Sequence, residues 1–274
     1  MDLTFAIIGP GSVGSVLERS LRKAGFVIST VLGRNDDLAD LPDSTAAVAI
    51  CTPDGSITEV AETLSGAPLS WSGRIVLHVS GALTSEVLAP LANLGALTLS
   101  FHPLSSYPPD VSGTSTRDLS GTTIAIEGHA AAVDSMLDVA RRLGAVPVVL
   151  SAHQKGAYHL AASMASNFLV TVSDSVQAVL EAAGLDPHLM DGLVKDTLHN
   201  LGSTPAGHAL TGPIARGDAN TIRLHLETLA AIAPNLVLLY KAMADTTIEI
   251  AFDAKRIDGA QRRSLRAVIE TTPD

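Results

Sequence analysis

The sequence has few cysteines, few aromatic residues and few basic residues, and each shortage excludes a class of protein. The single cysteine, Cys51, rules out an intrachain disulfide, so we expect a reducing, cytoplasmic environment. Lysine and arginine number 18 against 28 acidic residues, which gives a net charge of -10. This balance disfavours a nucleic-acid groove or an anionic membrane surface, because both need basic patches. We therefore expect no nucleic acid and no membrane among the partners.

Long apolar runs are also missing. No stretch approaches the ~18 uninterrupted apolar residues of a membrane-spanning helix, and the first residues lack the basic start and apolar run of a signal peptide. Hydrophobic residues make up 46% of the chain but aromatic residues only 3%, so alanine, valine and leucine must fill the core. With 274 residues, the chain is long enough for two domains of ordinary size.

Short apolar runs alternate with helical patterns in the first half of the chain. The runs predict strands at residues 3–9, 26–33, 46–51, 74–79, 96–101, 122–127 and 146–150. Helical patterns between several of these runs end in glycine, which is a common helix stop. The alternation predicts an α/β fold with a mainly parallel, doubly wound sheet. We therefore expect a dinucleotide-binding domain of the Rossmann type over residues 1–150.

Strand signals stop after residue 150, so residues 151–274 are expected to form an all-helical second domain. Residues 151–184 have the pattern of one helix of roughly 30 residues, with Ser151 as its N-cap and Gly184 as its stop. A loop rich in glycine and proline follows at residues 203–218, and Asp218 at its end is the expected N-cap of a later helix.

A glycine motif, GPGSVG, lies between the first predicted strand and the first predicted helix. In this context a G-x-G-x-x-G motif binds the pyrophosphate of a dinucleotide. The first glycine permits a tight turn, the second lets the backbone approach the pyrophosphate, and the third lets helix and sheet pack closely. Free N–H groups at the helix N-terminus then face the phosphates. The predicted cofactor-binding residues of this motif are Gly9, Pro10, Gly11, Ser12, Val13 and Gly14.

The end of the second predicted strand distinguishes NAD from NADP. An NAD site usually carries Asp or Glu about 20 residues after the glycine motif, whereas this chain has Arg34 there. An arginine suits the 2′-phosphate of NADP, and the neighbouring Asn35 can assist it. NADP is therefore the predicted cofactor. Asp36 is close enough in sequence to keep NAD as the less favoured alternative.

The next strands end in polar residues at the edge where a doubly wound sheet binds its ligands. The cofactor-binding residues predicted after the third strand are Thr52, Pro53 and Asp54. Cys51 beside them reads as a small core residue, because no basic neighbour in sequence would lower its pKa. Ser80 and His102 follow the next two strands and are expected to meet near the nicotinamide, where a histidine can exchange a proton with a substrate oxygen. The alternative for His102 is a His-Pro turn whose imidazole caps the strand end.

The predicted helix at residues 151–184 carries polar residues among small apolar ones. At about 100° per residue, Lys155, His159 and Ser163 share one face on successive turns, ~6 Å apart, and could line one pocket. Asn167 would lie about 80° round from His159 and some 12 Å further along the axis, so the two side chains could not share one reacting carbon. The alternative is a polar stripe at a helix–helix or subunit interface.

The loop at residues 203–218 offers two further polar side chains, Thr211 and Arg216. The guanidinium of Arg216 could clamp a substrate carboxylate with two N–H groups, although a plain surface arginine fits the spacing equally well. The histidines that fit no metal-ligand spacing are His188, His199, His208 and His225. We expect them at a surface or an interface, and we predict no metal.

These motifs together resemble bacterial Rossmann-like proteins whose C-terminal half is domain-of-unknown-function family 2520. The segments that carry the resemblance are GPGSVG, CTPD, HVSGA, FHPLSSY, YHLAASMASN and ALTGPIARGD. That family is similar in plan to ketopantoate reductase, pyrroline-5-carboxylate reductase and the β-hydroxyacid dehydrogenases. The resemblance implies a Rossmann domain, a helical domain like the C-terminal domain of 6-phosphogluconate dehydrogenase, and a homodimer formed through the long helix. It also implies reduction of C=O or C=N with a nicotinamide.

The chain departs from these relatives at two points. Relatives begin the long helix with a lysine and, four residues later, an amide; here Lys155 matches the lysine, but His159 stands in place of the amide. Ser80 and His102 also resemble the serine and His-Pro segments of prephenate dehydrogenase. The HPMxG of that enzyme is absent, because Leu104 follows the His-Pro pair.

The sequence therefore predicts an NADP-dependent oxidoreductase that reduces a C=O or C=N of a small carboxylate substrate, with ketopantoate as a hypothesis from the resemblance. The predicted acid is Lys155, His159 or His102, and Ser80 would orient the substrate with His102. The predicted substrate-binding residues are Ser163, Asn167, Thr211 and Arg216. Two rivals stay open: a prephenate-type dehydrogenase or imine reductase, and a non-catalytic NADP-binding sensor or assembly protein, since fold does not determine function.

Overall fold

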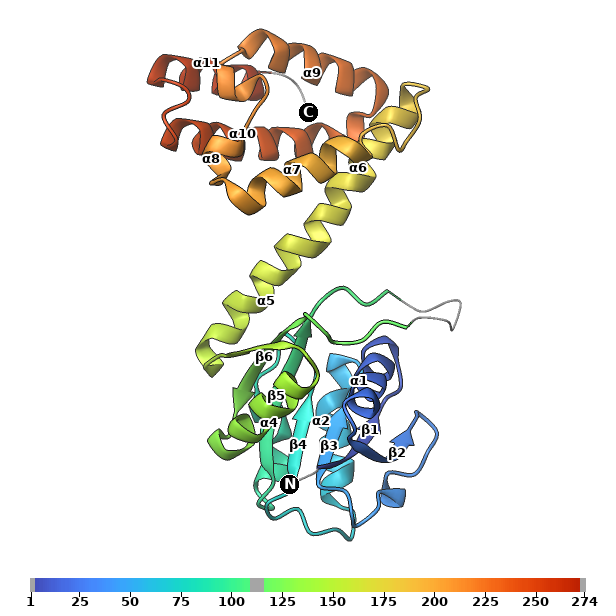
Figure 1. Ribbon diagram of the computed structural model, residues 1–274. Helices are drawn as coiled ribbons and strands as arrows, with labels where there is room; N and C mark the ends of the chain where they lie inside the picture. The colour runs from blue at the N-terminus through green and yellow to red at the C-terminus, as the bar shows by residue number, and fades with distance from the viewer. Residues whose placement is uncertain (1–2, 109–115, 272–274) are drawn as a thin grey trace. The chain divides into compact units, whose positions relative to one another are not determined.

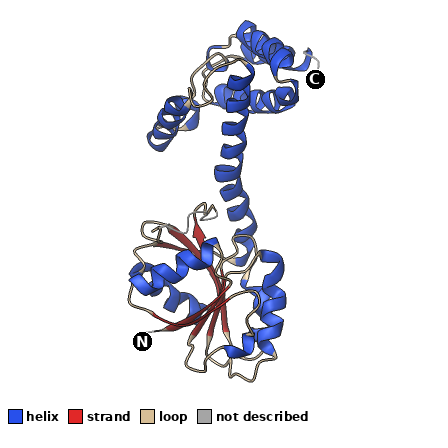
Figure 2. Cartoon of the chain, turned by 90° about the vertical axis from the view of Figure 1, so that its right-hand side faces the viewer, coloured by secondary structure: helices blue, strands red, loops and turns tan. Residues whose placement is uncertain are grey.

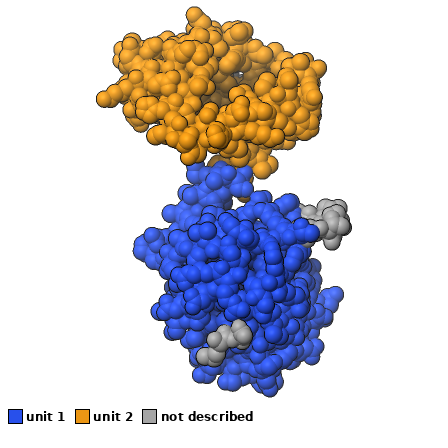
Figure 3. All heavy atoms as spheres, viewed as in Figure 1, with its two compact units in different colours: residues 1–166 blue, residues 167–274 orange. Residues whose placement is uncertain are grey.

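The computed structural model describes residues 3–108 and 116–271 (Figure 1). The chain forms two compact units, residues 1–166 and 167–274 (Figure 3). The last described strand ends at Val149, and helices follow from Ala152. The beginning of the long helix belongs to the first unit, because the buried side chain of Lys155 packs there.

The first unit contains a seven-stranded sheet in the order β2-β1-β3-β4-β5-β6-β7. The strands are β1 (Thr4–Ile8), β2 (Val27–Leu32), β3 (Ala47–Ile50), β4 (Ile75–His78), β5 (Leu97–Leu104), β6 (Thr123–Gly128) and β7 (Val146–Val149). Neighbouring strands are parallel, except that β5 and β6 are antiparallel. The strand order reverses between β1 and β3, which is where such a sheet opens a ligand crevice at its carboxyl edge. The predicted doubly wound, mainly parallel sheet is confirmed.

Helices cover both faces of this sheet (Figure 2). The helices α1 (Ser12–Lys23) and α4 (Ala130–Arg142) pack on one face, and α2 (Asp54–Ser65) and α3 (Ala89–Ala92) pack on the other. Successive residues of a strand alternate between the faces, so Phe5 joins the first layer and Ala6 the second. Both are apolar because a strand covered by helices on both sides has no solvent-facing side.

The contact between α1 and the β1–α1 turn requires glycine. A Cβ at Gly14 would lie 2.2 Å from the carbonyl oxygen of Gly9 and 3.1 Å from the Cβ of Cys51. We expect Gly14→Ala to lower the free energy of unfolding by roughly 1–3 kcal/mol or more, because the helix must move away from the turn. Urea unfolding measures this loss. Gly11→Ala is the matched control, since a Cβ there meets no described atom within 4 Å; equal stability of the two variants would contradict the close packing.

The long helix of residues 152–182 begins with a 3-10 turn and is interrupted by a π turn. It consists of a 3-10 turn at Ala152–Gln154, α5 (Lys155–Ser163), a π turn at Met164–Phe168 and α6 (Leu169–Ala182). Ser151 caps its start, as predicted, in a capping box with Gln154. The prediction of one regular helix is wrong between Met164 and Phe168, because a π turn holds more residues than an α turn. The phase of 100° per residue therefore does not locate Asn167.

The described residues of the second unit form helices joined by turns and loops, and they include no strand. It contains α6, α7 (Asp191–Ser203), α8 (Ala206–Ala209), α9 (Ala219–Ile232), α10 (Val237–Asp253) and α11 (Gly259–Thr271). Its core joins α9, α10 and α11 through residues such as Leu226, Ile248 and Leu265. The carboxylate of Asp218 accepts a hydrogen bond from the N–H of Thr221, which confirms the predicted N-cap of α9. Within the described part of the chain, no helix combines the length and the apolarity that crossing a membrane requires.

Candidate functional site

The β1–α1 turn has the geometry that a pyrophosphate needs. Gly9 has φ +91°, and a Cβ there would lie 3.0 Å from the backbone of Cys51 and Thr52. The helix begins at Ser12, directly after Gly11, which has no side chain to cap the helix. The space beside Gly11 is open among the described residues. The first N–H groups of α1 therefore end at an open position, where a phosphate can accept hydrogen bonds from them.

The loop after β3 adds an unpaired polar group. The hydroxyl of Thr52 is buried and has no hydrogen-bond partner in the described part of the chain. Leaving a buried hydroxyl unpaired costs about 1–3 kcal/mol, which a ligand atom at this position would offset. The open turn, the uncapped helix start and this hydroxyl together fit a bound dinucleotide. Cys51 is a buried core residue, as predicted, and burial raises the pKa of its thiol to about 12.

The segment after β2 gives its two charged residues different surroundings. The Asp36 carboxylate accepts a hydrogen bond from the backbone N–H of Gly33 at 2.7 Å, so it closes a turn of its own chain. Arg34 and Asn35 are exposed. Asp36, the residue that left NAD as an alternative cofactor, is thus hydrogen-bonded to the backbone. The Arg34 side chain is accessible to a phosphate.

Ser80 holds the loop that follows β4. Its hydroxyl donates to the carboxylate of Asp54 at 2.7 Å and accepts from the N–H groups of Ala82 at 3.2 Å and Leu83 at 3.1 Å. A hydroxyl has one donor and two acceptor positions, so none is left for a substrate. The expectation that Ser80 orients the substrate directly is therefore corrected: Ser80 positions a loop. Asp54, predicted at the cofactor, ties this loop to the start of α2.

His78, at the end of β4, has a structural role that the sequence did not indicate. The fully buried ring accepts the N–H of Ser80 at Nδ1, at 3.2 Å. The neutral ring therefore carries its proton on Nε2, which donates to the carbonyl oxygen of Thr84 at 3.1 Å. Burial lowers the pKa of His78 to about 4. The only sequence signal was a histidine at the end of an apolar strand.

This buried histidine makes stability depend on pH. The unfolded chain binds more protons than the folded one between the folded pKa of about 4 and the ordinary value of 6.5, so stability falls as the pH drops through that window. The slope from one such group is at most about 1.4 kcal/mol per pH unit. We expect His78→Asn to flatten the decline of Tm between about pH 7 and about pH 4, whereas the exposed His188→Asn should not. An unchanged decline in His78→Asn would contradict the assignment.

Lys155 is buried against the sheet, with only 1% of its surface exposed. Its Nζ donates to the carbonyl oxygen of Ser80 at 3.0 Å and to the hydroxyl of Ser100 at 2.7 Å. Ser100 on β5 lies directly opposite Glu127 on β6, so their side chains share one face of the sheet. Glu127 is also buried, and it accepts two hydrogen bonds from Ser85.

The charge of Lys155 is held in a low-dielectric environment. Burial lowers its pKa to about 8, and the negative charges of Glu127 and Asp54 oppose this fall. The ammonium is therefore still mostly protonated near neutral pH. A positive charge surrounded by protein acts more strongly on a nearby anion than one in water.

Two imidazole rings converge on Gly81, in the loop after β4. A Cβ at Gly81 would lie 2.7 Å from Nδ1 of His159 and 2.9 Å from Nε2 of His102. The Nδ1 of His159 is buried and has no hydrogen-bond partner among the described residues. The other nitrogen of His102, Nδ1, is 2.8 Å from the hydroxyl of Tyr158. Two ring nitrogens therefore face one small space beside Gly81.

The His102 ring is neutral near neutral pH. Burial, and after it the positive charge of Lys155, lower the pKa of His102 to about 4. Tyr158 keeps its proton, because burial raises its pKa to about 12. A hydrogen-bonding ligand beside Gly81 would thus meet one neutral imidazole backed by a phenol and a second imidazole with an unpaired nitrogen.

The four predicted catalytic residues lie close together in the first unit: Ser80, His102, Lys155 and His159. The sequence did not single out Gly81, Ser100, Tyr158 or Glu127 as members of this cluster. Ser163 follows His159 by one turn of α5 and is half-buried. The remaining predicted substrate residues, Asn167, Thr211 and Arg216, are exposed residues of the second unit, and their role stays a prediction. Residues 3–108 and 116–271 contain no group of three or more His, Cys, Asp or Glu side chains that could hold a metal ion.

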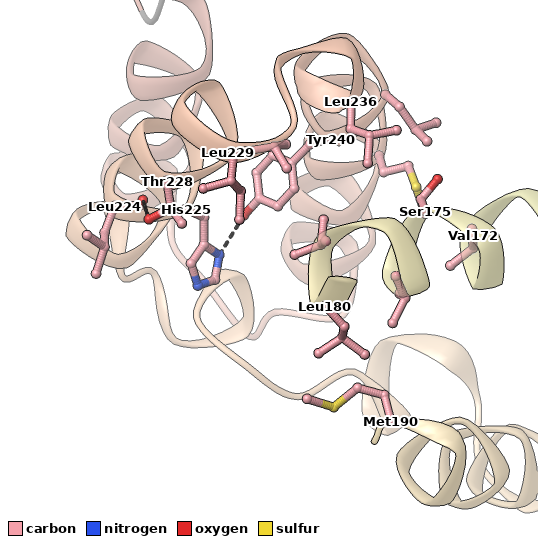
Figure 4. Close-up of a pocket in the computed structure, with 15 residues that line it drawn as sticks. Val172, Ser175, Leu180, Met190, Leu224, His225, Thr228, Leu229, Leu236 and Tyr240 are labelled. Atoms are coloured by element: carbon pink, nitrogen blue, oxygen red, sulfur yellow. Dashed lines mark hydrogen bonds between the residues drawn. The ribbon is translucent and has the colours of Figure 1, made fainter. Parts of the chain in front are cut away.

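The second unit has an apolar pocket of its own (Figure 4). Its volume is about 460 Å³, and its walls come mainly from α6, α9 and α10. Leu180, Leu229 and Leu236 are among the residues that line it. A polar pair lies at this pocket, where Nδ1 of His225 is 2.8 Å from the hydroxyl of Tyr240.

Two family models match successive parts of the chain. A Rossmann-like domain matches residues 1–103, and the Domain of unknown function (DUF2520) matches residues 122–247. The chain therefore carries a Rossmann-like domain followed by a DUF2520 domain. No match was found among curated proteins.

Several solved structures share the fold. A provisionally named NADP oxidoreductase from Bacteroides fragilis is 20% identical with a TM-score of 0.75, over 90% of this chain and 98% of that one. A Thermotoga maritima protein is 23% identical with a TM-score of 0.69, over 92% and 99% of the chains. An imine reductase from Myxococcus stipitatus, solved with NADP+, is 15% identical with a TM-score of 0.59, over 98% and 100% of the chains. At these identities the likeness establishes a common fold.

Proposed function

We propose that this protein is an NADP-dependent oxidoreductase that reduces the C=O or C=N bond of a small carboxylate substrate. The observation that carries the proposal is the pair of imidazole nitrogens beside Gly81, next to the buried ammonium of Lys155. This cluster combines the loop after β4 with His102 in the last part of β5, and it lies at the same sheet edge as the glycine turn after β1. The Ser80–Asp54 hydrogen bond joins it to the loop of Thr52.

NADPH, when bound, supplies the hydride, and residues of the first unit would hold it. The open glycine turn and the first N–H groups of α1 suit its pyrophosphate. The Thr52 hydroxyl is available to one of its polar atoms. Arg34 and Asn35 suit its 2′-phosphate.

We assign a separate role towards the substrate to each remaining residue of the cluster. The reacting oxygen or nitrogen would lie beside Gly81, within reach of His102 Nε2 and His159 Nδ1. His102 would donate the proton, and His159 would fix the orientation by a hydrogen bond. Lys155 already gives two N–H groups to protein oxygens, so we assign it the electrostatic role of stabilising developing negative charge. Ser163, Asn167, Thr211 and Arg216 remain candidates for the far end of the substrate.

Reduction of a C=N bond is the second candidate. It is favoured by the names of several structures with this fold, among them the imine reductase of Myxococcus stipitatus and a reductive aminase of Aspergillus terreus solved with NADPH. A panel of 2-keto acids including ketopantoate, simple ketones with added amine, and cyclic imines would be tested for NADPH oxidation. Turnover of ketopantoate would support the narrower assignment; turnover of cyclic imines alone would favour the imine reductase. The panel is also tested in the oxidative direction, with prephenate added.

A non-catalytic sensor remains the alternative of another class. It predicts NADPH binding without turnover of any panel member, and unchanged binding in Lys155→Ala and His159→Ala. Turnover in the wild-type protein that is lost in either variant would exclude it.

We propose NADPH rather than NADH as the physiological cofactor, and Arg34 provides the test. In Arg34→Ala, we expect the Kd for NADPH to rise roughly 10- to 100-fold, because a hydrogen-bonded charge on the 2′-phosphate is lost. The Kd for NADH should stay unchanged, since it lacks that phosphate. Calorimetric titration of both cofactors measures the effect, with the exposed Arg141→Ala as control. Equal weakening of both cofactors would contradict the assigned contact.

We also propose that the protein is a homodimer formed through the helical unit. Large apolar side chains are exposed on its helices, including Val170, Leu193 and Leu238. These exposed side chains and the apolar pocket of the same unit support the proposal, because a soluble protein usually covers exposed apolar area with a partner. Light scattering during size-exclusion chromatography tests this: a dimer is expected in the wild-type protein and a monomer in a Val170→Asp, Leu193→Asp variant. A wild-type monomer would overturn the proposal.

A further inference from the structure

Tyr158 and His102 form a pair whose geometry is directional. The phenol oxygen is 2.8 Å from Nδ1 of His102, and the rings meet edge to face with centroids 5.6 Å apart. Tyr158 is on α5 and His102 on β5, so the contact joins the long helix to the sheet. The far nitrogen of the same ring, Nε2, faces the space beside Gly81.

The hydrogen-bond inventory indicates which atom carries the proton. The Tyr158 hydroxyl has no second hydrogen-bond partner among the described residues, so its proton is satisfied within the protein only if it donates to Nδ1 of His102. A neutral imidazole that accepts at Nδ1 carries its own proton on Nε2. The resting pair therefore presents an N–H donor to the space beside Gly81.

We propose that Tyr158 and His102 form a two-step proton relay that serves the reduction, an inference that rests on the proposed function. As the hydride from NADPH reaches the carbonyl carbon, the Nε2–H bond of His102 breaks and an O–H bond forms on the substrate. At the same time the O–H bond of Tyr158 breaks and an Nδ1–H bond forms on the ring. A proton from bulk solvent, the one H+ that the reduction consumes, then binds Nε2 while Nδ1 returns its proton to the phenolate. The substrate gains one hydride and one proton, and NADPH becomes NADP+.

Without Tyr158, His102 would be a poor proton donor near neutral pH. Because the pKa of His102 is about 4, almost no imidazolium is present near neutral pH. The ring must therefore act as an acid from its neutral form, which holds one proton. A neutral imidazole can give up its Nε2 proton readily only if Nδ1 is protonated in the same step, and the phenol of Tyr158 is placed to do that. A phenol is a stronger acid than the alcohol being formed, so the transfer runs downhill. The relay therefore favours a carbonyl substrate over an imine, which is commonly bound already protonated.

Tyr158→Phe is the test, with Tyr240→Phe as a matched control. Tyr240 makes the same contact with His225 in the second unit, at 2.8 Å and edge to face, and that pair has no part in the relay. We expect Tyr158→Phe to lower kcat on the best carbonyl substrate roughly 100-fold or more while the Kd for NADPH stays unchanged. Tyr240→Phe should keep the wild-type kcat. A proton inventory in mixed H₂O and D₂O should be curved for the wild type, where two protons move, and linear for Tyr158→Phe.

Nitrogen-15 NMR of labelled histidine tests the resting pair without any substrate. In the wild type His102 should be neutral and protonated at Nε2, and Tyr158→Phe should shift it towards a mixture of tautomers. A wild-type ring protonated at Nδ1, or full turnover in Tyr158→Phe, would overturn the relay while leaving the proposed reduction intact. A wild-type protein that binds NADPH but reduces no member of the panel would overturn the proposed function, whatever the tautomer.

Discussion

Gly81→Ala is expected to lower kcat/KM at least roughly 100-fold, because a misplacement of about 1 Å near the reacting atoms is enough for such a loss. The added methyl group would lie 2.7 Å from Nδ1 of His159 and 2.9 Å from Nε2 of His102. Both distances are below van der Waals contact, so both rings must turn away. The methyl group would also occupy the position assigned to the reacting oxygen. Steady-state kinetics with the best substrate of the panel measures the loss.

The cofactor site should not respond to this substitution. We expect the Kd for NADPH in Gly81→Ala to remain within about twofold of the wild type, which corresponds to less than 0.5 kcal/mol. Gly156→Ala is the matched control: it lies on α5 next to Lys155, and a Cβ there meets no described atom within 4 Å. If Gly81→Ala kept full activity, the space beside Gly81 could not be the reaction centre.

Lys155→Met is expected to lower kcat roughly 100- to 1,000-fold, the range typical of removing a preorganised electrostatic group. Methionine fills a similar volume but lacks the charge that faces the Gly81 cluster. It also lacks the donors that hold the Ser80 carbonyl and the Ser100 hydroxyl. The exposed Lys195→Met on α7 removes the same charge from a distant surface and should keep wild-type activity.

Stability and catalysis can be separated in this variant. Lys155→Met removes a positive charge that interacts with the buried carboxylate of Glu127, so a lower Tm is expected. The double variant Lys155→Met, Glu127→Gln removes both charges and should recover part of the Tm without recovering kcat. Recovery of kcat in the double variant would show that Lys155 acts only through folding, against the electrostatic role.

The features that the sequence predicted correctly are those that depend on short spacing. The seven strands, the glycine turn and the Ser151 and Asp218 caps each follow from neighbouring residues, because hydrophobic period and cap chemistry are local. Lys155 and His159 could be placed on one face because they lie within the regular α5. The same reasoning failed for Asn167, since nothing in the sequence marks the π turn that precedes α6.

The organisation of the site depends on contacts between distant segments, which spacing does not reveal. The position of Ser80 after a strand predicts a substrate ligand, but its hydroxyl is fully used by Asp54 and two backbone N–H groups. No sequence motif marks Gly81. Its role depends on His159 of α5 and His102 of β5, whose imidazoles lie beside it. Glu127 reaches the cluster only through its register opposite Ser100.

Transfer of deuterium from NADPH labelled at nicotinamide C4 tests the central proposal most directly. The wild-type protein is incubated with the labelled cofactor and each member of the carbonyl and imine panel, and the products are analysed by mass spectrometry. The proposal predicts one deuterium on the former C=O or C=N carbon of at least one product, and labelling by Gly81→Ala or Lys155→Met that is roughly 100-fold slower or more. Tight binding of NADPH without label in any product, or equal labelling by the wild type and both variants, would contradict it.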